Sequence, residues 1–215
     1  MERLICLAIG YVFGLFQTSY IYGRMHGIDI RNYGSGNAGT TNMLRTLGTK
    51  AGILTFFGDC FKCVFAVWAV RLIFGRTYGE ILPLLSYYTA AGVILGHNYP
   101  FYLGFRGGKG IAATAGLLFS LNWMMTLLGI VTFGGTLLLT HYVSLGSLLV
   151  YAGMMIELVI FGQMGLFGMS QPYLNEMYAI GAALTVLAYW KHRENIKRLI
   201  HGNERKTYLL KKKKE

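Results

Sequence analysis

Phe105-Arg106-Gly107-Gly108-Lys109-Gly110-Ile111-Ala112-Ala113-Thr114 joins a basic, glycine-rich loop to an apolar run near the middle of the chain. Glycine has no Cβ, so successive N–H groups can turn toward one point, and the N-terminus of a following helix adds positive dipole. Lys109 adds a full positive charge. The stretch therefore predicts a loop that holds an anion. For this loop alone, a turn between two membrane helices with basic flanks is an equally good interpretation.

The lysine of this loop lacks the neighbours of a nucleotide-binding P-loop. In the pattern G-x-x-x-x-G-K-[ST], a hydroxyl side chain follows the lysine and reaches Mg²⁺. Here Gly110 follows Lys109, and Leu103 occupies the place of the first glycine. The sequence argues against nucleoside triphosphate hydrolysis and leaves phosphate binding open.

The composition is that of an integral membrane protein. Of the 215 residues, 54% are hydrophobic and only 13% are charged, against about 25% charged residues in soluble domains. We expect a single membrane-embedded domain over residues 1–206 and a basic cytoplasmic tail over 207–215. The net charge is +11, and ten Lys and Arg follow position 190 against three Glu. Such a tail favours the cytoplasmic side and anionic lipid, and we expect no nucleic-acid partner.

Several apolar runs are long enough to cross a bilayer, which takes about 20 helical residues. The run at 111–121 is shorter than that. The longer candidates are Leu4 to Tyr22, Ala51 to Phe74, Ile81 to Gly96, Trp123 to Thr140, Leu145 to Phe167, and Leu174 to Trp190.

Charge decides whether the short run crosses. If it crosses, the basic loops around residues 24–50 and 106–109 lie on the same side as the basic C-terminal tail, as the positive-inside rule favours. We therefore predict an all-α, polytopic integral membrane protein with seven transmembrane helices. Its N-terminus lies outside and its C-terminus is cytoplasmic. The short helix is expected to be surrounded by the others, because broken or short helices persist where protein covers them.

A second glycine-rich loop runs from Gly34 to Asn42 and precedes Arg45. Ser35 and Asn37 are short-range hydrogen-bonding groups, and the Arg45 guanidinium can make a forked contact with phosphate. An N-capped turn is the alternative, because Ser, Thr and Asn are good caps. Two such loops on one side of the membrane favour anion binding.

Two ionisable residues lie three apart within an apolar run, Asp59 and Lys62, so they share one helical face. An isolated charge at the bilayer centre costs about 2.5–3.5 kcal/mol on insertion scales, so both should face the bundle interior. We favour a structural ion pair over a direct chemical role. His97 could reach a phosphate or cap its own helix, and the sequence leaves both open. Ser144 is most simply an N-cap and secondarily a substrate contact.

The last segment continues from a spanning run as a basic helix. His192 and Asn195 lie on one face of it, close to the membrane plane, where they can meet the loops. The other charges of this helix are those of an ordinary solvated face.

Together these segments resemble the bacterial acyl-phosphate:glycerol-3-phosphate acyltransferase family from the first span to Lys206. Ala38 departs from the family pattern, which commonly has proline there. The matching motifs are Gly34-Ser-Gly-Asn-Ala-Gly-Thr-Thr-Asn42 with Arg45, Asp59-x-x-Lys62, Gly96-His-Asn-Tyr-Pro100 with Gly107-Gly-Lys-Gly110, Tyr142-Val-Ser144-Leu-x-Ser147, and His192-Arg-x-Asn195-Ile-x-Arg198-Leu with Gly202-x-Glu204-x-Lys206.

The resemblance implies transfer of a fatty acyl group from acyl phosphate to the 1-hydroxyl of glycerol 3-phosphate, giving lysophosphatidic acid and phosphate. It implies a multi-pass protein of the bacterial inner membrane with a cytoplasmic active site. We expect no metal, no cofactor and no obligate protein partner. Carried over by position, the catalytic candidates are Ser35, Arg45, Lys109, His192 and Asn195. The substrate-binding candidates are Gly36, Asn37, Gly107, Gly108, Gly110, Thr114 and Ser144, and the structural ones are Asp59, Lys62 and Glu204.

The general base stays open between two groups. Either His192 takes the proton of the attacking hydroxyl, or a phosphate oxygen of the substrate takes it while His192 donates a hydrogen bond. We favour the second. Two other functions compete with acyl transfer: transport of a phosphorylated metabolite, because glycine loops at broken helices also bind anions in transporters, and hydrolysis of a lipid phosphate.

Overall fold

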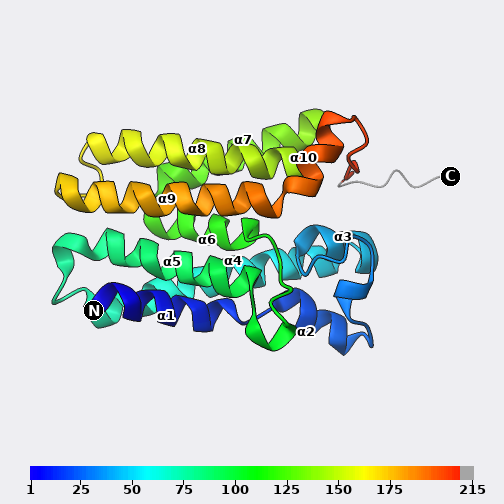
Figure 1. Ribbon diagram of the computed structural model, residues 1–215, viewed down its shortest axis with the longest axis horizontal. Coiled ribbons are helices and arrows are strands. Elements are labelled where there is room, and N and C mark those ends of the chain that lie inside the picture. The colour runs from blue at the N-terminus through cyan, green and yellow to red at the C-terminus, as the bar shows by residue number, and fades with distance from the viewer. Residues whose placement is uncertain (209–215) are drawn as a thin grey trace.

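A computed structural model describes residues 1–208, and within that range every regular element is helical. The long helices lie side by side, with α6 between the other layers, and the N-terminus and α10 lie at opposite ends of the bundle (Figure 1). The predicted lysine run at 211–214 lies outside the described residues. The helices are α1 Glu2–Gly14, α2 Thr18–Met25, α3 Thr40–Leu47, α4 Thr49–Phe74, α5 Leu82–Asn98, α6 Ile111–Leu121, α7 Trp123–Thr140, α8 Val143–Gln163, α9 Gln171–Lys191 and α10 Arg193–Ile200.

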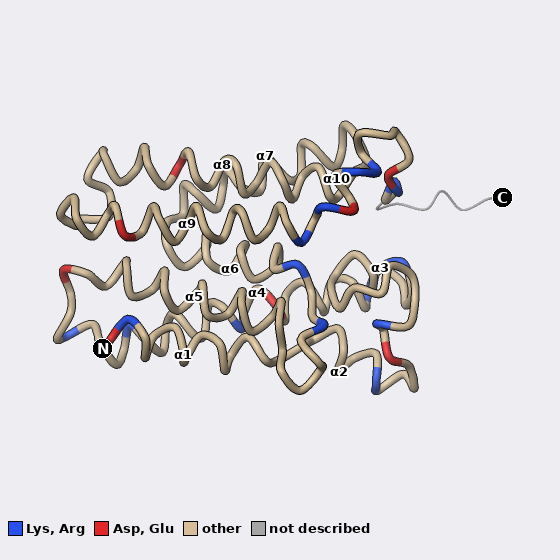
Figure 2. Tube along the Cα trace, viewed as in Figure 1, with Lys and Arg blue, Asp and Glu red and all other residues tan. Residues whose placement is uncertain are grey.

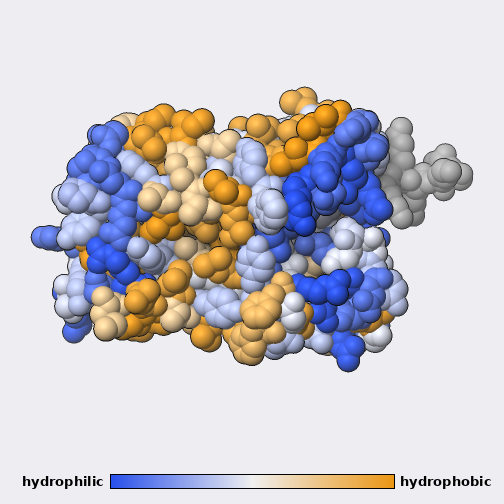
Figure 3. All heavy atoms as spheres, viewed as in Figure 1, coloured by the Kyte–Doolittle hydropathy of each residue, from blue (hydrophilic) through white to orange (hydrophobic). Residues whose placement is uncertain are grey.

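The surface has the hydropathy of a membrane protein. Five helical stretches in the described chain are long and apolar enough to cross a bilayer. On the face drawn in Figure 3, hydrophobic residues occupy the middle of the molecule and hydrophilic residues occupy its two ends. The 21-residue α9 has the length of a span but a more polar sequence, and α6 is shorter, as its sequence predicts.

The first predicted span is not one continuous helix, which corrects the range Leu4 to Tyr22. It is broken between α1 and α2 at residues 15–17. Donor side chains take up the carbonyl oxygens that the break leaves free. The Gln17 amide donates to the oxygen of Gly14 at 3.1 Å, and the Lys62 ammonium donates to that of Phe16 at 2.6 Å. A helix end inside apolar surroundings needs such partners.

Glycines bring α1 and α5 into backbone contact. A Cβ at Gly10 would lie 1.9 Å from the carbonyl oxygen of Thr89, and one at Gly96 would lie 2.3 Å from that of Tyr11. Small residues spaced four apart allow such close approach between membrane helices. The contact fixes the end of α5, which carries His97, against the break after α1.

The packed part of the chain extends slightly past residue 206. Thr207 is buried, and its N–H donates to the carbonyl oxygen of His141 at 2.8 Å. The segment after α10 therefore folds back onto the turn between α7 and α8. The boundary of the expected tail lies beyond Thr207.

Candidate active site

One cavity of about 490 Å³ opens among the loops at the end of the bundle that holds α10. Its walls come from both glycine loops, from the start of α8 and from the junction of α9 with α10. Six Lys or Arg residues line it against three Asp or Glu residues. Figure 2 shows basic residues gathered around this end. Segments far apart in the sequence therefore meet at a cavity with surplus positive charge.

The first glycine loop is shaped by the Asn42 side chain. Its Oδ1 accepts from the N–H of Ser35 at 2.9 Å, and its Nδ2 donates to the carbonyl oxygen of Tyr33 at 2.9 Å. Gly34 and Gly36 have positive φ angles of 60° and 69°, a conformation that glycine adopts without strain. Ser35, Gly36 and Asn37 all line the cavity.

Arg45 approaches the cavity from α3. Its guanidinium donates to the Thr207 hydroxyl at 2.7 Å and to the Arg205 carbonyl oxygen at 3.1 Å. These bonds link α3 to the segment after α10. The guanidinium is thereby held beside the first glycine loop.

The second glycine loop is built differently from the expected cradle of successive N–H groups. The N–H of Gly107 donates to the carbonyl oxygen of Asn98 at 3.3 Å, and that of Gly108 donates to the carbonyl oxygen of His97 at 3.0 Å. Neither glycine lines the cavity. Both N–H groups are thus bonded to carbonyl oxygens at the end of α5, and a substrate-binding role for these two glycines stays a prediction. They also serve close packing: a Cβ at Gly107 would lie 2.0 Å from the His97 oxygen.

The donors that do face the cavity come next in the chain. Lys109, Gly110, Ile111 and Ala112 line it, and the first turn of α6 leaves N–H groups without intrahelical acceptors. The Lys109 ammonium donates to the Asn195 amide oxygen. Burial, reinforced by the positive charge of Arg198, lowers the pKa of Lys109 to about 8.

His192 lies where α9 ends, and its ring is buried beside the cavity. Nδ1 is 2.8 Å from the carbonyl oxygen of Ala188, which can only accept, so Nδ1 carries the proton. Burial and the positive charge of Lys109 lower the pKa of His192 to about 4. A neutral ring protonated at Nδ1 presents Nε2 as an acceptor. The sequence analysis expected His192 to donate a hydrogen bond to the substrate, whereas in this tautomer its Nε2 accepts one.

Glu204 connects three parts of the site. Its carboxylate accepts from the Ser144 hydroxyl at 2.9 Å, the Asn195 amide at 2.7 Å and the Arg198 guanidinium at 2.7 Å. Although burial favours the neutral acid, these bonds hold the pKa of Glu204 below its ordinary value. The arrangement favours the predicted structural role of Glu204.

Two polar candidates are placed differently from expectation. Ser144 is not the N-cap of α8, which is Tyr142, and its hydroxyl is engaged with Glu204 at the cavity wall. Thr114 does not line the cavity. Its fully buried hydroxyl lies 2.6 Å from the Tyr151 hydroxyl and bonds the Gly110 carbonyl oxygen at 3.0 Å. Thr114 therefore braces the start of α6 rather than facing a substrate.

The predicted buried ion pair is present. Lys62 Nζ and Asp59 Oδ1 are 2.9 Å apart, and both side chains are almost fully buried. Asp59 also lines the cavity, whereas Lys62 does not.

The site also contains residues that the sequence-based list omitted. Arg198 lines the cavity from the same helix as Asn195, and Lys191 and Arg193 flank His192 there. The signal for Arg198 was available: it lies three residues after Asn195, on one helical face. No pattern pointed to Asn42 as the residue that shapes the first loop.

Comparisons with known proteins agree on one family. Residues 4–202 match the family described as glycerol-3-phosphate acyltransferase. The glycerol-3-phosphate acyltransferase of Clostridioides difficile (strain 630) is 39% identical over 205 residues, covering 94% of each chain. That of Mycoplasmopsis synoviae (strain 53) is 40% identical over 227 residues, covering 97% of this chain and 96% of the relative.

Solved structures give the same result for the fold. The glycerol 3-phosphate form of PlsY (YgiH), an integral membrane glycerol 3-phosphate acyltransferase, superposes with a TM-score of 0.82. It is 31% identical and covers 97% of this chain and 96% of its own. The lysophosphatidic acid form of the same protein superposes with a TM-score of 0.80. This chain is therefore a member of the glycerol-3-phosphate acyltransferase family, an integral membrane acyltransferase of lipid biosynthesis.

Proposed function

We propose that this enzyme transfers a fatty acyl group from acyl phosphate to the 1-hydroxyl of glycerol 3-phosphate, releasing lysophosphatidic acid and inorganic phosphate. The observation that carries the proposal is the convergence of Ser35, Arg45, Lys109 and Asn195 on one cavity with surplus basic residues. Both substrates carry a phosphate group. Charge-assisted hydrogen bonds contribute about 1.5–3 kcal/mol each, so several of them offset the repulsion between two bound anions.

The two substrates occupy different parts of the cavity in this proposal. We assign the glycerol 3-phosphate phosphate mainly to Ser35, Arg45, Lys109 and Asn195. The acyl phosphate lies against the start of α6, where Gly110 and Ile111 face the cavity. Acyl phosphate is already activated, so the enzyme mainly has to align the hydroxyl with the carbonyl carbon and stabilise the developing negative charge.

His192 aligns the hydroxyl in this proposal. Its Nε2, which has no hydrogen-bond partner within residues 1–208, accepts from the neighbouring 2-hydroxyl of glycerol 3-phosphate while Ala188 holds Nδ1. The 1-hydroxyl is thereby aligned and keeps its proton for a phosphate oxygen. A ring whose pKa is about 4 is a weak base. A phosphate oxygen of glycerol 3-phosphate is the better proton acceptor, so we assign the proton to the substrate.

A pH profile of His192→Gln tests this assignment. We expect kcat to fall about 10- to 100-fold from loss of the hydrogen bond. The acidic limb of the kcat profile should be unchanged, because the titrating group belongs to the substrate. Loss of that limb in the variant would identify His192 as the base. His201→Gln is the matched control, since His201 also bonds the carbonyl four residues back but is exposed.

For the topology we propose seven crossings, by α1, α4, α5, α6, α7, α8 and α9. An odd number agrees with the opposite placement of the N-terminus and α10 (Figure 1). The basic cavity end then faces the cytoplasm of a bacterial inner membrane, with the N-terminus outside.

The reaction is tested with purified protein, palmitoyl phosphate and glycerol 3-phosphate. We expect lysophosphatidic acid and phosphate in equal amounts, with phosphate release dependent on glycerol 3-phosphate. Equal release without the acceptor would instead identify a phosphatase. Uptake of glycerol 3-phosphate into vesicles without any product would identify a transporter.

A further inference from the structure

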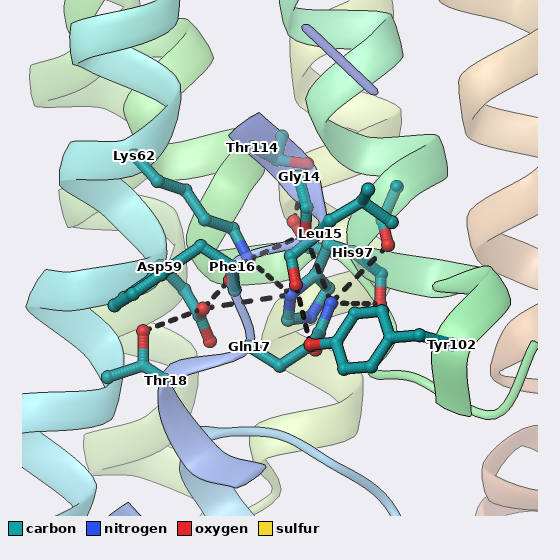
Figure 4. Close-up of polar contacts among 12 residues, drawn as sticks. Gly14, Leu15, Phe16, Gln17, Thr18, Asp59, Lys62, His97, Tyr102 and Thr114 are labelled. Carbon is teal, nitrogen blue, oxygen red and sulfur yellow. Dashed lines mark hydrogen bonds and ion pairs between the residues drawn. The ribbon is translucent and has the colours of Figure 1, made fainter. Parts of the chain in front are cut away.

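A second histidine faces the cavity and has no role in the reaction described so far. His97, at the end of α5, is buried within a polar cluster that also contains Thr18, Asp59 and Lys62 (Figure 4). The Thr18 hydroxyl donates to Asp59 Oδ1 at 3.1 Å, and Lys62 Nζ lies 2.9 Å from the same oxygen. The cluster is therefore already neutralised internally. Its function need not be structural alone, because Asp59 and His97 both line the cavity.

Lys62 determines which nitrogen of His97 carries the proton. Its ammonium lies 2.9 Å from Nδ1 of His97. An ammonium group can only donate, so Nδ1 must accept, and the neutral ring then carries its proton on Nε2. The same ammonium is anchored to the carbonyl oxygen of Phe16 at 2.6 Å and to Asp59. Lys62 is thus fixed from several sides, and it fixes the tautomer of His97.

The protonated nitrogen points toward the second glycine loop. A Cβ at Gly108 would lie 2.0 Å from Nε2, so the ring edge packs directly on that glycine. Within residues 1–208, Nε2 has no hydrogen-bond partner. This nitrogen is also not completely buried. His97 itself lines the cavity, so an anion bound there is a candidate acceptor for this N–H.

The two cavity histidines therefore have opposite hydrogen-bonding roles. His192 presents an acceptor because Ala188 holds its Nδ1–H, and His97 presents a donor because Lys62 occupies its Nδ1. They lie on different elements, one after α9 and the other at the end of α5. This matches the needs of the two substrates, one of which brings a hydroxyl proton and the other an anionic group.

We propose that His97 donates a hydrogen bond from Nε2 to the phosphoryl group of the acyl phosphate, and that Lys62 is the positioning residue that enforces this tautomer. The inference rests on the proposed function. In the transfer, the substrate hydroxyl oxygen forms the new ester bond to the carbonyl carbon while the bond from that carbon to the phosphate oxygen breaks. The hydroxyl proton goes to a phosphate oxygen of glycerol 3-phosphate, and the bonding electrons stay on the departing phosphate. A donor at that phosphate stabilises the growing charge.

Nitrogen NMR on the detergent-solubilised protein with ¹⁵N-labelled histidine tests the tautomers directly. His97→Gln and His192→Gln assign the two residues among the five histidines. We expect His97 to be protonated on Nε2 alone, and we expect the acylphosphonate analogue of palmitoyl phosphate to shift that N–H. A proton on Nδ1, or no shift at saturating analogue, would overturn the proposal. Lys62→Met should release His97 into a mixture of tautomers, whereas retention of a pure Nε2–H form would refute the positioning role.

Kinetic measurements on two His97 variants distinguish a hydrogen-bonding role of this side chain from a packing role. Gln places an amide donor near the position of Nε2, so His97→Gln should retain most activity, whereas His97→Phe should lose about 10- to 100-fold in kcat/KM for palmitoyl phosphate. KM for glycerol 3-phosphate should change little in either variant. His201→Gln is the control, and thermal unfolding confirms folding of each variant. Equal activity of His97→Phe and wild type would refute the inference and leave the proposed function standing. Failure of the wild type to use acyl phosphate would refute both.

Discussion

The two ends of the bundle both carry charged residues, but they use them differently. At the end that holds the N-terminus, Arg3 contacts Glu176 at 2.6 and 3.0 Å, and Tyr88 donates to the same carboxylate at 2.6 Å. Arg3 also contacts Glu2 at 2.5 Å. At the other end, six basic residues and three acidic residues surround a cavity.

The difference shows how structural and functional charges can be told apart. Groups that satisfy one another join helices, as Arg3 and Glu176 join α1 to α9. A cavity lined by a surplus of charges of one sign is suited to bind a ligand of the opposite charge. Removing a group that is satisfied by its neighbours should therefore affect stability, and removing one of the surplus cations at the cavity should affect turnover.

The largest effect is expected from Lys109→Ala. It removes the charge that bonds Asn195 at the cavity, so activity should fall by on the order of 10²-fold or more while the fold persists. Lysophosphatidic acid production and thermal unfolding measure the two quantities. Lys50→Ala is the control, because Lys50 is exposed on α4 and does not line the cavity. If Lys109→Ala turned over substrate at the wild-type rate, Lys109 could not be a ligand of the glycerol 3-phosphate phosphate.

Gly108→Ala should reduce activity by about tenfold or more. The new Cβ would lie 2.0 Å from Nε2 of His97 and 2.8 Å from the carbonyl oxygen of Ala38, so the ring or the first glycine loop must move. Gly104→Ala is the matched comparison in the same loop, since its added Cβ meets nothing within 4 Å, although its φ of 63° adds local strain. Equal activities for the two variants would mean that contact with His97 does not matter.

Glu204→Gln should change the pH dependence of stability. The pKa of Glu204 is lower in the folded protein than in the unfolded chain. Its carboxylate therefore stabilises the fold fully above about pH 4.3, the ordinary glutamate pKa, and the stabilisation is lost as the pH falls through the lowered value. We expect the variant to melt at a lower temperature at pH 7 and to lose less stability on acidification. A parallel pH curve for both proteins would contradict the role of the carboxylate.

The smallest effect on activity is expected from Glu176→Gln. Both side chains of the Arg3 pair are 29% exposed, so solvent screens the interaction. Loss of about 1 kcal/mol would lower the melting temperature by roughly 2–4 °C. KM and kcat should remain those of the wild type. A tenfold fall in kcat with this small shift would abolish the distinction between the two ends.

Much of the helical arrangement is predictable from sequence because hydropathy determines it. The ranges Ile111 to Leu121 and Trp123 to Thr140 agree with α6 and α7 residue for residue. The break after α1 was not predictable, because it depends on side chains from other helices, Lys62 among them. No proline or local motif marks it.

The site shows the same limit. Motif spacing identified Lys109, His192 and Asn195 as neighbours of one cavity. Motif spacing could not show that the N–H groups of Gly107 and Gly108 donate to carbonyl oxygens at the end of α5. Those bonds depend on where α5 ends, at His97 and Asn98. The direction in which each histidine donates likewise depends on contacts with Ala188 and Lys62 that only the fold brings together.

The central claim is that distant segments form one cavity on the cytoplasmic side, and cysteine labelling tests it most directly. Ser35 and Arg193 both line the cavity from distant parts of the sequence. An impermeant maleimide reports which side of the membrane reaches the variants Ser35→Cys and Arg193→Cys. The parent protein, in which Cys6 and Cys63 are buried and Cys60 is partly buried, gives the background. We predict that both positions label in inside-out vesicles only, and that glycerol 3-phosphate slows both reactions. Labelling of the two positions from opposite sides of the membrane would contradict the account.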